Sequence, residues 1–472
     1  MTAFRSWPTL LAPLAFALLA GGLLVFAFRG GPDEVSLRIP AAGRKDAAAL
    51  SGPSPLESGT TTAGPGIAAE LPGSWPGFRG AGLDAISPER IPLLDSWPEE
   101  GPPQQWSVAV GEGYAGPAIH AGRVYLMDYD REAQADALRC LSLADGREIW
   151  RFSYPVAVKR NHGMSRTVPA VAGDAVVALG PMGHVSCVDA ATGEFRWGAD
   201  LVRDHGTEIP PWYAGQCPLV DGDRVILAPA GRPPDGPLLC ALDLPTGETL
   251  WSTPNTLSWK MTHASIAVAE IEGVRTYVYC GHRGVAGISA EDGTLLWSTP
   301  EWRISLATVP TPVPLPDGRL FLSGGYKAGS LMLQVRSGTE GWKSEPLFRL
   351  DDDAFGATQQ TPIWYEDHLF GVRPDGELVC LDPDGSVLWS SGPSHRFGLG
   401  PFLIADGKLL VMDDHGELTM AAASNERFEM LARAKVLDGH DSWAPMAIAG
   451  GLLIVRDLTE MRCLDLRLDP SP

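Results

Sequence analysis

The sequence is poor in cysteine and in basic residues, and each shortage excludes a class of protein. It has 7 cysteines in 472 residues, an odd and sparse set that does not suit a disulfide-stapled fold. Lysine and arginine number 37 against 57 aspartate and glutamate, which gives a net charge of −20. No stretch is rich in lysine or arginine, so we expect no surface that follows the phosphate backbone of a nucleic acid.

One long hydrophobic run stands at the amino terminus. Residues 7–28 contain no charged side chain, and a helix of that length can cross a hydrocarbon core of about 30 Å. A cleaved signal peptide is the alternative, but its apolar part is usually shorter and no small-residue cleavage site follows here. We therefore predict a transmembrane helix or signal anchor over residues 1–29, which attaches the chain to a membrane.

The next segment has a different composition. Roughly two thirds of residues 31–74 are Gly, Pro, Ala, Ser or Thr, and none is aromatic. Such a segment buries too little apolar surface to offset the entropy lost on ordering. The composition predicts a flexible linker over residues 30–74, followed by a folded domain over residues 75–472.

From Trp75 onward the chain repeats a unit of about 47 residues. One mark is a Gly turn followed by Trp, at 145–150, 192–197, 246–251, 292–297 and 384–389. The other mark is a residue that opens an apolar strand: Pro117, Pro169, Pro218, Ile266, Pro312, Pro362, Pro401 and Pro445. Asp-Gly and Thr-Gly supply the positive φ angles of tight hairpins, so each unit is typical of four short strands.

A four-stranded sheet in every such unit predicts an all-β fold, a β-propeller. The last unit lacks its Trp strand, whereas residues 105–110 precede the first unit and carry a Trp in the corresponding place. We expect this early strand to complete the last blade and close the ring. We predict eight blades of four antiparallel strands, with seven blades as the alternative.

Two units are degenerate, because units five and seven lack the Trp after the turn. In the fifth unit Trp342 or Phe348 is expected to replace it, and in the seventh Phe428 or Leu431. Five of the seven cysteines share a single repeat position, at Cys140, Cys187, Cys240, Cys380 and Cys463. We expect them to be small buried strand residues.

The pattern Leu-Asp-x-x-Thr-Gly-x-x-x-Trp resembles the tryptophan-docking repeat of quinoprotein-type propellers, the pyrroloquinoline quinone (PQQ)-like superfamily. The segment SWPGFRG at 74–80 is also similar to the opening segment of large bacterial members. The resemblance covers about residues 75–467. It implies the propeller fold and two kinds of function, PQQ-dependent dehydrogenases and non-catalytic relatives such as a lipoprotein that helps to assemble outer-membrane proteins.

Functional residues are expected in the connections that lead from the outer strand of one blade to the inner strand of the next. In a propeller these connections meet at the mouth of the central channel, and polar and aromatic groups on a concave surface favour a ligand or partner site. The residues that we single out there are His162, Arg160, Arg166, Asp204, Trp259, Lys260, His263, Arg303, Asp441 and Trp443.

Two functions remain open at this stage. For a PQQ-dependent oxidoreductase similar to alcohol dehydrogenases, with calcium, Arg160, Arg166, Lys260 and Arg303 would pair with the cofactor's carboxylates, and Trp259 or Trp443 would stack on it. Asp204 or Asp441 would serve as the base, with His162 and His263 as further catalytic candidates.

The sequence lacks the adjacent-Cys pair found beside the cofactor in many dehydrogenases of this superfamily, and it has no C-x-x-C-H haem motif. We therefore favour a membrane-anchored binding or scaffold module on the extracytoplasmic, periplasmic side. Its expected partner is a protein, peptide or glycan at the channel mouth, and we predict no separate metal site.

Overall fold

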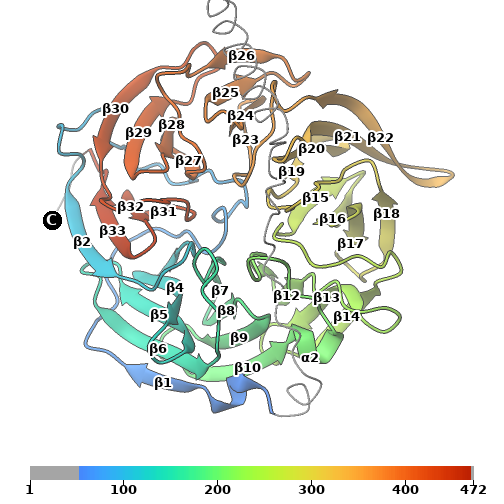
Figure 1. Cartoon of the computed structure of the whole chain (residues 1–472), viewed down its shortest axis with the longest axis horizontal. Coiled ribbons are helices and arrows are strands. Elements are labelled where there is room, and N and C mark those ends of the chain that lie inside the picture. The colour runs from blue at the N-terminus through green and yellow to red at the C-terminus, as the bar shows by residue number, and fades with distance from the viewer. Residues whose placement is uncertain (1–52, 469–472) are drawn as a thin grey trace, which may run out of the picture. The chain divides into compact units, whose positions relative to one another are not determined.

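The computed structural model describes residues 53–468, which form a closed ring of eight β-sheets (Figure 1). Seven sheets in this part of the chain have four strands and one has five. The prediction of an all-β, eight-bladed propeller with antiparallel four-stranded blades is confirmed, and the seven-blade alternative is wrong. The transmembrane helix predicted over residues 1–29 lies outside the described residues. Between residues 53 and 468 no helix is long and apolar enough to cross a membrane.

Each blade runs from the channel axis to the rim. The first four blades are β3 (Ala118–His120), β4 (Arg123–Asp130), β5 (Ala135–Ser142) and β6 (Glu148–Pro155); β7 (Ala170–Ala172), β8 (Ala175–Leu179), β9 (His184–Asp189) and β10 (Phe195–Asp200); β11 (Leu219–Asp221), β12 (Arg224–Leu227), β13 (Pro237–Asp243) and β14 (Thr249–Pro254); and β15 (Ala267–Ile271), β16 (Val274–Gly281), β17 (Gly284–Ser289) and β18 (Leu295–Thr299).

The other four blades follow the same order. They are β19 (Val313–Pro314), β20 (Arg319–Gly324), β21 (Gly329–Gly338) and β22 (Gly341–Leu350); β23 (Ile363–Tyr365), β24 (His368–Val372), β25 (Leu378–Leu381) and β26 (Val387–Ser390); β27 (Phe402–Ala405), β28 (Lys408–Met412), β29 (Glu417–Ala422) and β30 (Met430–Lys435); and β31 (Ala447–Ala449), β32 (Leu452–Arg456), β33 (Glu460–Asp465) and β2 (Gln104–Ala109). Short helices lie at η2 (Pro55–Ser58), α2 (Leu201–His205) and η3 (Pro316–Gly318).

The tryptophans at the start of the outer strands join neighbouring blades. Trp106 donates its indole N–H to the carbonyl of Leu143 at 2.8 Å, and Trp150 donates to Ala190 at 3.2 Å. Four of these rings lie on the turn glycine of the next blade: Trp106 on Gly146, Trp150 on Gly193, Trp197 on Gly247 and Trp251 on Gly293, where a Cβ would come within 2.8 Å of the ring. In these blades the repeated pattern of a turn glycine and a Trp has a physical basis, because the indole of one blade packs on the turn glycine of the next.

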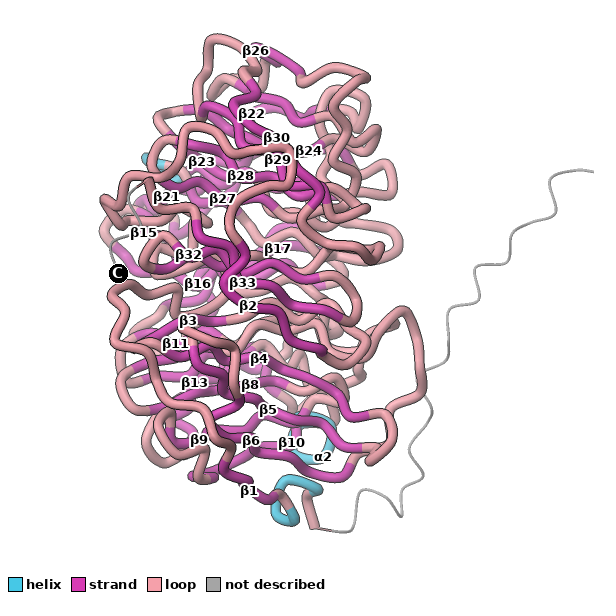
Figure 2. The backbone as a smooth tube through the Cα atoms, turned by 90° about the vertical axis from the view of Figure 1, so that its left-hand side faces the viewer, coloured by secondary structure: helices cyan, strands magenta, loops and turns pink. Residues whose placement is uncertain are grey.

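The amino-terminal strand closes the ring, as predicted. Strand β2 pairs antiparallel with β33, and Trp106 lies opposite Cys463, the register that the other blades give to their own Trp (Figure 2). Pairing distant parts of the chain in one sheet removes the open edge that an incomplete last blade would present. The seven cysteines are buried and unpaired.

In the two degenerate blades the register shows which residue replaces the Trp. Phe348 pairs with Met332 in the fifth blade, and its ring lies 2.6 Å from where a Cβ on Gly385 would be. In the seventh blade Ala432 takes the position, opposite Met420. The expectation of Phe428 or Leu431 was wrong. Phe428 instead packs against the Trp389 ring of the sixth blade, at 5.9 Å between centroids.

The segment predicted as a linker is partly folded. Strand β1 (Thr60–Ala63) pairs with β6 as a fifth strand of the first blade, and Leu56 in η2 is 2% exposed. The linker prediction is therefore wrong for residues 53–74, while residues 30–52 lie outside the described part. Composition missed this segment because backbone pairing to an existing sheet edge needs few apolar side chains.

Residues 75–95 cross the channel on the face that carries the turns between first and second strands (Figure 1). Trp75 exchanges two backbone hydrogen bonds of 2.8 Å with Ile119 in the first blade, and the amide of Ile404 in the seventh donates to Ala85. Arg79, buried in the channel, donates to four backbone carbonyls, two of them in the sixth blade. This floor segment, residues 75–95, thereby closes one end of the channel.

Removing the indole that closes the ring should destabilise it. We expect Trp106→Ala to lower the free energy of unfolding by about 3–5 kcal/mol, because it empties a buried aromatic site and breaks a hydrogen bond. Urea unfolding followed by circular dichroism measures this loss. Leu347→Ala, at a side chain that is 52% exposed on the rim, is the control and should change stability by less than about 1 kcal/mol. Equal losses in the two variants would contradict the account.

A buried carboxyl group lies between the first and second blades. Asp136 has no exposed surface, and Tyr154 donates its hydroxyl to Oδ2 at 2.7 Å. Burial raises the pKa of Asp136 to about 7. The folded protein therefore binds this proton more tightly than the unfolded chain does. The resulting stability is complete below about pH 4 and is lost as the pH rises through about 7.

We expect Asp136→Asn to become progressively more stable than the wild-type protein as the pH rises from 4 to 7. The gain is up to about 1.4 kcal/mol per pH unit, because the amide cannot ionise. Thermal unfolding of both proteins across this range measures the difference. Glu132→Gln, in the exposed loop of the same blade, is the control. A difference between Asp136→Asn and wild type that does not change with pH would rule out the buried proton.

Candidate functional site at the channel mouth

The open end of the channel holds a cavity of about 330 Å³. All eight connections between blades contribute to its wall, since Tyr114, Arg166, Trp212, His263, Ala307, Gln359, Leu399 and Trp443 each come from a different one. Phe78 of the floor segment lies at its inner end. The prediction that these connections converge on one mouth is confirmed.

Arg166 is the cation on this wall. Its Nε donates to the carbonyl of Trp212, and its Nη2 donates to the carbonyls of Asn161 and His162 at 3.1 and 2.8 Å. The guanidinium also lies 5.1 Å from the centre of the Tyr114 ring. Desolvation lowers the pKa of Arg166 to about 10, so the group remains charged at neutral pH. Backbone carbonyls thus hold the cation in place without neutralising it.

An aromatic wall stands beside this arginine. The rings of Trp443 and Tyr114 stack at 5.3 Å with an angle of 22° between their planes. Trp443 donates its indole N–H to Asp414 Oδ1 at 2.7 Å, and Tyr114 donates its hydroxyl to Asp441 at 3.3 Å. Both rings are therefore fixed, which lowers the entropy that a ligand stacked on them would cost.

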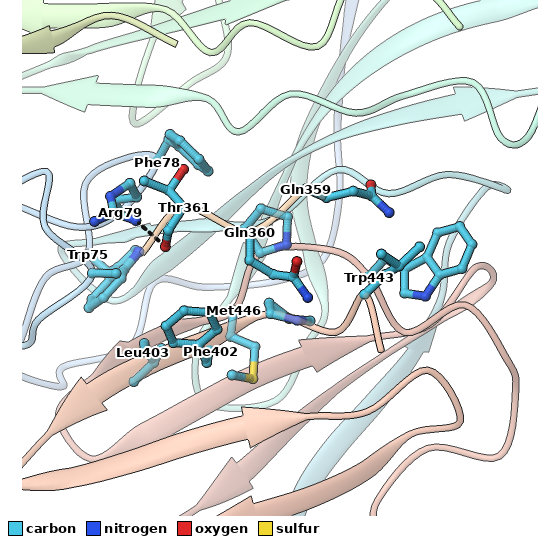
Figure 3. Close-up of a pocket in the computed structure, with 14 residues that line it drawn as sticks. Trp75, Phe78, Arg79, Gln359, Gln360, Thr361, Phe402, Leu403, Trp443 and Met446 are labelled. Atoms are coloured by element: carbon cyan, nitrogen blue, oxygen red, sulfur yellow. Dashed lines mark hydrogen bonds between the residues drawn. The ribbon is translucent and has the colours of Figure 1, made fainter. Parts of the chain in front are cut away.

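A smaller cavity of about 80 Å³ lies between the mouth and the floor segment (Figure 3). Trp443 and Phe78 line both cavities. In Figure 3 Arg79 turns toward Thr361, whose carbonyl accepts its hydrogen bond at 3.0 Å. The mouth therefore holds the larger of these two cavities. Two further cavities, of about 170 and 250 Å³, lie beside the floor segment, where Phe78 and Leu83 face the inner strands.

The structure brings together four of the predicted site residues. His162, Arg166, His263 and Trp443 line the cavity, and Asp441 stands directly behind Tyr114. Desolvation, with the positive charge of Arg166, lowers the pKa of His263 to about 4, so this imidazole is neutral at pH 7. It can exchange hydrogen bonds with a ligand but supplies no charge.

The remaining predicted residues are elsewhere. Arg160 pairs with Glu112 at 2.8 Å and Lys260 with Glu208 at 2.6 Å, both on the exposed surface. The other three do not line the cavity: Trp259 is buried against Gly281, Arg303 is exposed, and Asp204 accepts a hydrogen bond at the amino end of its own short helix α2. The repeat pattern predicted correctly that these residues lie in the connections on the mouth face. It did not predict how far each side chain lies from the channel axis.

Sequence analysis also missed residues of the site. Tyr114 lies in the connection from β2 to β3, which the repeat phase predicts once the closing strand is recognised. Phe78 lies in the floor segment, and nothing in the repeat places that segment inside the channel. Tyr326 comes from the turn between β20 and β21, on the same face as the connections but outside them.

These residues do not fit the PQQ and calcium alternative. A planar tricarboxylate needs several cations, whereas Arg166 is the one Arg or Lys among the residues that line the mouth. Over residues 53–468 no three His, Cys, Asp or Glu side chains are grouped so that they could hold a metal ion. Two carboxylates in neighbouring connections, Glu112 and Asp441, already have partners in Arg160 and His440.

A family model described as the outer membrane protein assembly factor BamB matches residues 100–209 and 134–383, more than half of the chain. The chain belongs to this family. The family's propellers are PQQ-like, in agreement with the repeat and the eight blades. A comparison with curated protein sequences gave no significant match.

Solved structures share the fold of this BamB-type propeller. BamB from Moraxella catarrhalis is 15% identical, with a TM-score of 0.53 over 77% of this chain and 100% of that one. The computationally designed protein Ika8 is 12% identical, with a TM-score of 0.50 over 77% and 100%. The quinohemoprotein alcohol dehydrogenase ADHIIG from Pseudomonas putida is 14% identical, with a TM-score of 0.45 over 85% and 82%. At such identities the likeness shows the fold alone.

The electrostatic effect of Arg166 on His263 can be tested by titration. We expect the pKa of His263 to be about 4 and to move toward the ordinary value of about 6.5 in Arg166→Gln, since removal of the cation favours the imidazolium. Proton NMR of the imidazole measures both values. Arg160→Gln removes an exposed cation of the same connection and is the control. An equal shift in both variants would contradict the arrangement at the mouth.

Proposed function

We propose that this propeller is a binding module, and that its channel mouth receives a segment of a protein, peptide or glycan. The observation that carries the proposal is the cavity at the channel mouth, whose wall is built from all eight connections. Fixed aromatic rings and an arginine around an open cavity are typical of a ligand site, and a channel that serves only as structural support does not need them. At about 330 Å³ the cavity suits a few residues or sugar units, as ligand pockets do.

The family match supports a protein as the partner. The matching family is described by a factor that assembles outer-membrane proteins, so we propose a protein of that process as the ligand and the periplasm as the location. The predicted anchor at residues 1–29 would hold the propeller beside a membrane. Because residues 53–74 pack on the first blade, the linker in this proposal is shorter than the sequence suggested, residues 30–52.

PQQ-dependent oxidation is the second candidate, and it rests on the repeat pattern alone. Its supposed cofactor ligands are dispersed, with Arg160 and Lys260 paired to surface carboxylates. A binding function without catalysis requires only the residues that line the mouth. We therefore place the binding function first.

Titration of the full chain in detergent with a panel of short peptides and oligosaccharides tests the proposal. We expect saturable binding that quenches tryptophan fluorescence and weakens at least tenfold in Trp443→Ala, which removes one wall of the cavity. Leu347→Ala on the outer strand β22 is the matched control and should bind as the wild-type protein does. Saturable binding of PQQ with calcium, together with dye-coupled alcohol oxidation, would overturn the proposal in favour of the oxidoreductase.

A further inference from the structure

The charge at the mouth indicates the chemical class of the ligand. Arg166 lines the cavity, and within residues 53–468 no Asp or Glu oxygen lies within ion-pair distance of its guanidinium. Nearby carboxylates are engaged elsewhere: Glu112 with Arg160 at 2.8 Å, and Asp441 with His440 at 3.2 Å and with Tyr114. Arg166 is half-buried, and a partly desolvated guanidinium without a counter-ion is costly, so an anion that arrives with the ligand offsets part of that cost.

The guanidinium also has donors left for such an anion. Nε and Nη2 are used by the carbonyls of Trp212, Asn161 and His162. Nη1 has no acceptor in the described part of the chain, so its two N–H groups remain. These backbone contacts fix the plane of the guanidinium. Donors held in one plane favour a carboxylate, which is itself planar, as the anion.

The surroundings of the cation combine aromatic and aliphatic side chains with uncharged polar ones such as Ser265 and Gln359. Trp443 and Tyr114 stand on one side and Val309 and Leu399 also line the cavity. His263 stays neutral there because desolvation and Arg166 lower its pKa to about 4. A ligand that satisfies the whole wall therefore joins one negative group to an apolar or aromatic body.

We propose that the mouth binds a peptide through one carboxylate next to an aromatic or aliphatic side chain, with Arg166 as the carboxylate-binding residue. This inference rests on the proposed binding function and names its ligand class. The carboxylate can come from the carboxyl terminus of the peptide or from an Asp or Glu side chain, since both present the same two oxygens. Figure 3 shows Trp443, the ring against which the apolar part packs.

Isothermal titration calorimetry on the full chain in detergent tests this inference with matched peptides. One peptide ends in Phe with a free carboxylate, a second is its carboxyl amide, and a third places Glu beside an internal Phe and is amidated. We expect the amide to bind about 10- to 100-fold more weakly than the free acid, as loss of a charge-assisted hydrogen bond predicts. Comparison of the first and third peptides separates the two sources of the carboxylate.

The same pair of peptides measured on Arg166→Gln separates anion binding from a structural role. Removal of the cation should abolish the preference for the acid, so that acid and amide bind this variant equally. If Arg166 only holds the loops, both peptides weaken together and the preference survives, which overturns the inference. Arg147→Gln, at a side chain 68% exposed on a turn, is the charge-matched control and should keep the full preference.

Two further outcomes distinguish this inference from the proposed function. If acid and amide bind the wild-type protein equally and Trp443→Ala weakens both, the mouth is a binding site but carboxylate recognition is wrong. If none of the peptides binds while uronic-acid or neutral oligosaccharides do, the peptide ligand is wrong and the binding function stands. Failure of every ligand would overturn both.

Discussion

The pairing of β2 with β33 is the contact on which the rest of the structure depends. It joins residues near the start of the propeller to its last strand, so that the ring closes only when the last blade is in place. Closure brings the eighth connection, which carries Tyr114, back to the mouth beside Trp443 of the seventh. Without that pairing neither the stacked aromatic wall nor the contact of the Tyr114 ring with Arg166 would exist.

A second constraint acts along the channel axis. The floor segment spans the ring from the first blade to the seventh, and buried Arg79 ties it to backbone carbonyls of the sixth. The floor segment covers one end of the channel, and the eight connections line the cavity at the other end. The turns on the floor side share the Gly-containing sequence of the repeat. The connections at the mouth differ from one another in sequence. Function is therefore expected on the irregular face.

The fold could be predicted from the sequence because its signal is repeated. A Trp or Phe ring lies on a glycine of the following turn in five of the eight blades, as Trp106 and Gly146 show, so this local requirement recurs along the chain. Prediction failed where the requirement is absent: Ala432 fills the Trp position of the seventh blade without any sequence mark. Strand β1 was missed because its stability comes from the backbone of β6 and from one buried leucine.

The site was predictable only to the level of the face. The repeat pattern assigns Arg160, Lys260 and Arg166 to connections of the same kind. It does not show which of these side chains form ion pairs with surface carboxylates. Glu112 and Glu208 pair with the first two, and Arg166 alone turns to the cavity. Trp259 and Trp443 differ in the same way, since the first packs on Gly281 and the second on Tyr114. Such choices depend on side-chain contacts between blades that are distant in sequence.

Native-state amide hydrogen exchange of the full chain tests ring closure most directly. If β2 is an integral strand of the last blade, its amides that pair with β33 exchange only with unfolding of that blade, at the same rate as the amides of β33 itself. In Trp106→Ala the two strands should lose protection together with the mouth connection that carries Tyr114. Fast exchange of β2 in the wild-type protein, with β33 and the mouth still protected, would contradict closure as the basis of the site.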